Sequence, residues 1–109
     1  MARDTGFPDD VRAAIRARSG SKCELCGLAR AAQIHHRRPR AAGSTRRPET
    51  NFATNGLHVC GDCHDRVESD RGEALDNGWL VSQNEDPAAI PVLYRGESLF
   101  LDQIPDAPY

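Results

Sequence analysis

Two Cys-x-x-Cys pairs are the residues of this chain most able to do chemistry. Cys23 and Cys26 form the first pair, Cys60 and Cys63 form the second, and 33 residues separate them. Paired thiolates of this kind deliver two ligands each to a tetrahedral zinc ion. The gap is longer than the roughly 15–20 residues of a simple zinc ribbon, so an insert must lie between the two turns. The sequence therefore predicts one structural zinc site with four cysteine ligands.

Two other readings of the cysteines are weaker. Disulfides need an oxidising compartment, and the N-terminus has no apolar stretch typical of a secretory signal. The segment Cys60-Gly-Asp-Cys63-His64 also matches the attachment motif of c-type haem. Covalent haem attachment requires export, and haem would leave the first cysteine pair unexplained. Zinc is therefore favoured over both.

The histidines are concentrated between the two cysteine pairs and just after the second. All four lie within residues 35–64: His35, His36, His58 and His64. Closure of both pairs on one zinc would bring His64 close to the insert, where a short strand can present His35 and His36. Successive strand residues point to opposite faces, so these two share a site only if the strand bends or ends there. His58 is read as a surface or packing residue.

The charge of the chain is unevenly distributed. Residues 1–60 carry 11 Lys and Arg against 5 Asp and Glu, whereas residues 61–109 carry 3 against 11. The positive charge is densest at a group of arginines: Arg30, Arg37, Arg38, Arg40, Arg46 and Arg47. This concentration indicates a local site for a polyanion, although a solvated arginine-rich loop would look the same.

The elements that must position these residues are short. A helix is predicted to open at Phe7-Pro8-Asp9-Asp10 and to end at Gly20, a second to run from Cys60 through Glu68, and a third to cover 71–76. Strands are predicted for 32–36, 57–59, 79–81, 92–94 and 98–101, with a polar loop over 40–50 and a turn at 95–96. At 109 residues the chain suits a single domain, whose modest core a metal would help to stabilise. We expect the C-terminal segment to pack on the metal core as an accessory hairpin.

The sequence contains no apolar run near the ~18 residues that a membrane-spanning helix needs. Together with the missing secretory signal, this predicts a cytoplasmic protein of a bacterial or phage-infected cell.

Three segments together resemble the HNH endonucleases of the ββα-metal nuclease superfamily, in particular small phage proteins of that family. They are Cys23-Glu-Leu-Cys26, Ile34-His35-His36-Arg37-Arg38-Pro39 and Asn55-Gly-Leu-His-Val-Cys60-Gly-Asp-Cys63-His64. The resemblance implies an α+β fold with a zinc-stabilised ββα-metal core over residues 23–69. An N-terminal helix would precede this core, and residues 70–109 would form a C-terminal accessory helix and hairpin.

The resemblance also implies catalytic roles. His36 would be the general base that takes a proton from the attacking water. His35 and His64 would bind a catalytic divalent ion, magnesium, manganese or nickel, separate from the zinc, and the roles of His35 and His36 could be exchanged. Asn55 would orient His36 or join the metal shell, with Asn51 as the second choice.

The implied substrate is DNA, held mostly through its phosphates. The residues expected to grip it are Arg37, Arg38, Arg40, Arg46 and Arg47. Small phage HNH proteins often work beside the DNA-packaging machinery, so packaging proteins are further expected partners. The alternative is a zinc-stabilised module that binds nucleic acid or acts as an adaptor without cutting. His36, together with His35 and His64, distinguishes the two, because a pure binder does not need them.

Overall fold

The computed structural model describes residues 6–39 and 48–107 and has an α+β fold. Two small sheets, each of two antiparallel strands, are combined with three α-helices and short 3₁₀ helices. The elements are α1 (Asp9–Ser19), β1 (Gln33–His36), β2 (Gly56–Val59), α2 (Gly61–Ser69), α3 (Arg71–Asp76), β3 (Val92–Tyr94) and β4 (Glu97–Leu99). This confirms the predicted fold class at the level of α+β.

Helix α1 begins and ends where the sequence signals place it. Asp9 and Asp10 lie in its first turn, where carboxylates are favoured by the unpaired amides and the helix dipole. Gly20 ends it in the left-handed conformation, with φ 65°, and its N–H donates to the carbonyl of Arg16. Ile15 is fully buried and lies on the face of α1 that packs against Gly56.

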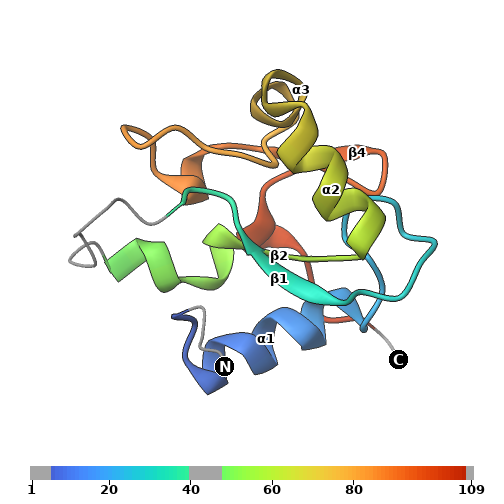
Figure 1. Ribbon diagram of the computed structural model, residues 1–109. Coiled ribbons are helices and arrows are strands. Elements are labelled where there is room, and N and C mark those ends of the chain that lie inside the picture. Colours follow the sequence, from blue (N-terminus) through green and yellow to red (C-terminus); the bar gives the residue numbers. More distant parts are fainter. Residues whose placement is uncertain (1–5, 40–47, 108–109) are drawn as a thin grey trace.

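The β1–β2 hairpin is the centre of the molecule, and Figure 1 shows it lying between α1 and α2. The strands pair from Gln33 opposite Val59 to His36 opposite Gly56. Gly56 permits close packing of α1 on this hairpin, because a Cβ there would lie 2.6 Å from Ile15 Cδ1. Helix α2 follows β2 directly, so the chain makes a strand–strand–helix unit.

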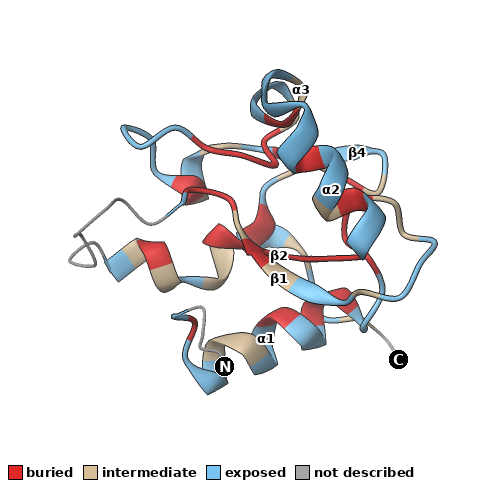
Figure 2. Cartoon of the chain, in the orientation of Figure 1, coloured by how far each residue is buried: buried red, intermediate tan, exposed pale blue. Residues whose placement is uncertain are grey.

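One hydrophobic cluster contains most of the buried apolar side chains. It joins the cysteines to side chains of β2 and α2 and to side chains from the C-terminal segment, among them Trp79, Tyr94 and Leu101. Strand β2 is buried along its length, as Figure 2 shows, whereas the outward face of α2 is exposed. The C-terminal segment is thus packed on the core that contains the cysteines.

The prediction for residues 79–81 is wrong, because these residues form an irregular segment instead of a strand. Gly78 has φ +73°, and the chain reverses there so that the N–H groups of Trp79 and Leu80 both donate to the carbonyl of Ala74. Val81 N–H donates to the carbonyl of Arg37. The second hairpin, β3–β4, forms as expected around a turn in which Arg95 and Gly96 both have positive φ.

The predicted loop over 40–50 is described only in part. Residues 40–47 lie outside the described residues, and Pro48–Asn51 forms a short 3₁₀ helix. Among the helices of the described residues, none has the length and apolar character that crossing a membrane requires.

Candidate metal centres

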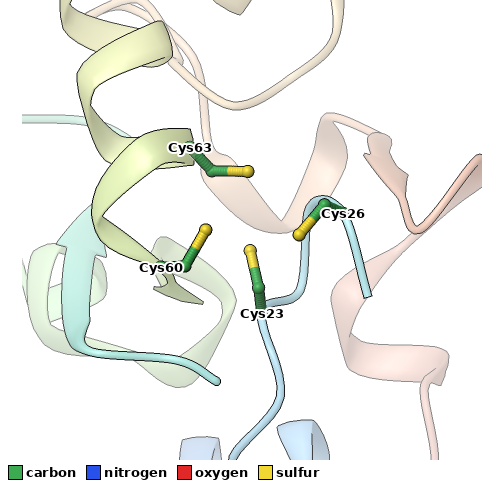
Figure 3. Close-up of side chains that lie close together, drawn as sticks. All are labelled: Cys23, Cys26, Cys60 and Cys63. Carbon is green, nitrogen blue, oxygen red and sulfur yellow. The ribbon is translucent and has the colours of Figure 1, made fainter. Parts of the chain in front are cut away.

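The four cysteines converge on one point. Figure 3 shows their sulfur atoms pointing toward one another, and the four atoms all lie within 4.8 Å of each other. Cys23 and Cys26 come from the turn after α1, whereas Cys60 and Cys63 flank the first turn of α2. The arrangement matches the four-thiolate set that structural zinc prefers.

The surroundings of the thiols fit a metal site. The pKa of Cys26 is lowered to about 6, because the backbone N–H groups of Leu28 and Ala29 point at its sulfur. Burial raises the pKa of Cys60 and Cys63, so these two would stay protonated without a cation. A zinc ion would supply that missing positive charge and displace their protons.

A second group of ligand atoms includes His64, the residue after Cys63 in α2. The atoms of His35, His64 and Glu68 are within 4.8 Å of one another, and the two imidazole rings meet edge-on with centroids 5.4 Å apart. Glu68 follows His64 by one helical turn, and its Oε2 lies 3.7 Å from His64 Nε2. Two imidazoles and a carboxylate form a ligand set suited to a divalent transition ion.

The surroundings of His35 leave its ring neutral, with Nδ1 able to bind a metal ion. Its Nε2 lies 2.9 Å from the carbonyl oxygen of Trp79, which can only accept a hydrogen bond. The proton of the neutral ring therefore belongs on Nε2, and the lone pair is on Nδ1. Burial lowers the pKa of His35 to about 4, so the ring is neutral at physiological pH. The metal-ligand role of His35 stays a prediction.

His36 is the last residue of β1 and lies on the opposite face of the strand. Its ring stacks on Phe7 with centroids 4.1 Å apart, and its Nε2 is 3.4 Å from Asn51 Oδ1. Because the strand ends here, His35 and His36 both line the same pocket, of about 300 Å³, together with His64. The structure therefore brings the three histidines of the prediction to one pocket.

Asn55 has a different task from the one expected. Its side chain is fully buried, and its amide group is bonded to main-chain atoms: Oδ1 accepts from Arg38 N–H, and Nδ2 donates to the carbonyls of Arg38 and Thr50. These bonds close the loop that follows β1. The asparagine that approaches His36 is Asn51, so the contact expected of Asn55 falls on the second choice.

Arg37 and Arg38 do not fit the prediction that they bind phosphate. Arg37 is fully buried, and its guanidinium donates to four carbonyls, those of Thr54, Gly78, Pro87 and Ile90. Arg38 is 2% exposed, donates to the carbonyl of Glu85 and pairs with Glu49. The end of β1 at His36 explains the difference, because the two residues after it turn inward and bind carbonyls of the C-terminal segment. Arg40, Arg46 and Arg47 lie outside the described residues.

His58 is a packing residue in the interior. Its Nδ1 lies 2.7 Å from Ser19 Oγ, and its backbone N–H donates to the buried carboxylate of Glu24. Arg18 holds the same carboxylate in a bidentate ion pair, at 2.6 and 2.7 Å, and Tyr94 donates its hydroxyl to it. This buried polar group joins α1, the first cysteine turn, β2 and β3.

Sequence reasoning missed two residues at the histidine pocket. Glu68 lies four residues after His64, and that spacing on a helix could have identified it. Arg71 lines the pocket from the start of α3, a position that depends on how α3 turns back on α2.

Comparison with known proteins identified no similar protein. No protein-family model matches the chain, and no curated protein and no solved structure is significantly similar to it. The functional assignment therefore rests on the two clusters of ligand atoms and on the sequence resemblance.

Proposed function

We propose that the protein is a metal-dependent endonuclease of the HNH type that hydrolyses phosphodiester bonds of DNA. The observation that carries the proposal is the strand–strand–helix unit in which His35 of β1 faces His64 of α2, with His36 at the edge of the same pocket. A protein that only binds DNA has no need for imidazoles grouped around an open pocket. The resemblance to HNH endonucleases assigns these three histidines to the same site.

His36 is the proposed general base. In this role the His36 ring, whose Nε2 lies 3.4 Å from Asn51 Oδ1, would take a proton from the attacking water. The water oxygen then bonds to phosphorus, and the bond from phosphorus to the leaving oxygen breaks. His35, His64 and Glu68 would hold the divalent ion, which supplies Lewis-acid stabilisation of the phosphate charge when bound.

The four-cysteine centre has a supporting role in this proposal. Cys63 and His64 are consecutive residues of α2, so a zinc ion that fixes the first fixes the start of the helix that presents the second. The zinc itself takes no part in the chemistry. DNA is the proposed partner, and the link to phage packaging stays a prediction from the resemblance.

The test is a plasmid-cleavage assay on zinc-loaded protein freed of other divalent ions, with magnesium, manganese or nickel added in turn. Wild type should cut with at least one ion. His36→Ala should lose activity by about 10²–10⁴-fold, the usual contribution of a general base, while still binding DNA. Asp65→Ala is the matched control, because Asp65 is an exposed residue of the same helix α2.

Cleavage by His36→Ala at the wild-type rate would show that the base is another residue. Absence of cleavage by wild type with every ion, in protein that retains its zinc and binds DNA, would favour the alternative of a non-catalytic binding module or adaptor.

A further inference from the structure

An arginine at the histidine pocket has no role in the function proposed so far. Within the described part of the chain, the pocket lining includes a single arginine, Arg71, the first residue of α3. Its side chain is 58% exposed, and its Nη1 lies 3.6 Å from Oε1 of Glu68. The partner of this cation is therefore itself a candidate metal ligand.

The neighbouring arginines are held by other groups. Arg37 and Arg38 are buried and bonded to main-chain carbonyls. Arg66 is held by both carboxylate oxygens of Glu73, at 2.6 and 2.9 Å. The ion pair of Arg71 is longer and exposed, and such a pair contributes little stability in water. Arg71 can therefore exchange its partner at small cost.

Glu68 lies between the metal ligands and this arginine. Its Oε2 faces His64 Nε2 at 3.7 Å, while its Oε1 faces Arg71. A carboxylate that coordinates an ion together with His35 and His64 has less negative charge to offer a guanidinium. Arg71 then remains at the pocket as a planar donor, the geometry that suits the oxygens of a phosphate.

Building on the endonuclease function, we propose that Arg71 binds a non-bridging oxygen of the DNA phosphate at this pocket and that Glu68 couples this contact to the metal. Glu68 pairs with Arg71 in the ion-free protein. It releases Arg71 to the phosphate when it joins His35 and His64 in binding the ion.

The test measures binding of a fluorescent DNA duplex by anisotropy, with and without Mn²⁺, in zinc-loaded protein carrying His36→Ala so that the DNA stays intact. Mn²⁺ should raise the affinity by on the order of tenfold, the worth of one charge-assisted contact. Adding Arg71→Gln should remove most of this gain, leaving the part due to the ion itself, and lower the salt dependence of binding by about one phosphate contact. Arg16→Gln is the matched control, because it removes the same charge from the exposed side of α1, outside the pocket.

A second measurement separates phosphate binding from metal binding. Without DNA, Arg71→Gln should bind Mn²⁺ at least as tightly as the parent, whereas Glu68→Gln should bind it more weakly. Retention of the Mn²⁺-dependent gain in Arg71→Gln would overturn the proposal, as would weaker Mn²⁺ binding by that variant. If wild type cuts no DNA with any ion, the endonuclease function fails, and these binding differences still decide the role of Arg71.

Discussion

The last two residues of β1 and the residue that follows them have three different surroundings. His35 points toward α2 and the candidate metal ligands, His36 points toward Phe7 at the start of α1, and Arg37 is buried beneath the C-terminal segment. The alternation of a strand separates the first two, and the end of the strand turns the third inward. A run that looks uniformly basic in the sequence is thus divided between a pocket and the protein interior.

Arg37→Ala should lower the free energy of unfolding, because Arg37 has a structural role and does not contact DNA directly. The carbonyl of Pro87 keeps the N–H of Ile90 as a donor, but those of Thr54, Gly78 and Ile90 lose the guanidinium. At a cost of about 1–3 kcal/mol for each of these three, a total loss of at least about 3 kcal/mol is expected. Urea unfolding of the zinc-loaded protein measures this. Arg30→Ala, at an exposed position, should change the free energy of unfolding by no more than about 0.5 kcal/mol. Equal stability of the two variants would contradict a structural role for Arg37.

The buried His35 makes stability depend on pH. Its pKa is about 4 in the folded protein, below the ordinary 6.5, because burial disfavours the charged ring. Between these values the unfolded chain binds a proton that the folded protein does not, so stability should fall as the pH drops from 6.5 to 4 and then level off. In His35→Gln this fall should be shallower, with the remaining slope due to the thiolates and to His58, whose pKa is also lowered by burial. Identical slopes in urea titrations of the two proteins would refute the assignment.

At the scale of elements, the turn that carries Cys23 and Cys26 is held from two sides. The sulfur atoms face the start of α2, while Glu24 between them is buried against Arg18 of α1 and Tyr94 of β3. The turn is therefore a junction at which α1, α2, β2 and β3 meet. Loss of the metal would remove one of its two supports.

Cys60→Ser should abolish folding, or lower the melting temperature by well over 10 °C, because zinc binding and folding are coupled in small domains. Leu28→Ala is the control in the same metal turn region, since the Leu28 side chain is 89% exposed. Circular dichroism with a zinc assay measures both variants. An unchanged melting temperature for Cys60→Ser would argue against a structural zinc.

The helices and most strands follow from local signals in the sequence. Acids and Gly20 bound α1, the cysteine turn starts α2, and the Arg95–Gly96 turn produces the second hairpin. The convergence of the four cysteines is predictable because a metal site needs it. The tasks of Asn55 and Arg37 are not predictable, because they depend on which distant carbonyls the folded chain brings within reach. The irregular path of residues 79–81 escaped prediction for the same reason.

At the scale of the whole molecule, the C-terminal segment helps to build the histidine pocket. The carbonyl of Trp79 accepts a hydrogen bond from His35 Nε2–H, and the indole N–H of Trp79 donates to the carbonyl of Leu93 in β3. Gly78 lies so close to the chain before β3 that a Cβ there would be 2.0 Å from the carbonyl oxygen of Pro91. The candidate site is thus completed by residues far from the metal motifs in sequence.

Gly78→Ala should therefore impair both stability and metal binding at the histidine pocket. A methyl group cannot fit beside Pro91, and the positive φ of Gly78 adds strain for any other residue, so a loss of several kcal/mol is expected. Gly61→Ala is the control, because a Cβ there meets no atom within 4 Å. The fluorescence of Trp79, the only tryptophan, reports unfolding in both variants. Equal midpoints would contradict the close packing described here.

Because Cys63 and His64 are adjacent in α2, the supply of zinc in the cell would affect the histidine pocket. If the four thiolates hold zinc, a chain made during zinc starvation cannot fix the start of α2 and is left to proteases. The amount of folded protein would then follow the zinc supply of the cell more closely than the rate of its synthesis. Under the proposed endonuclease function, DNA cleavage would be withheld while zinc is scarce.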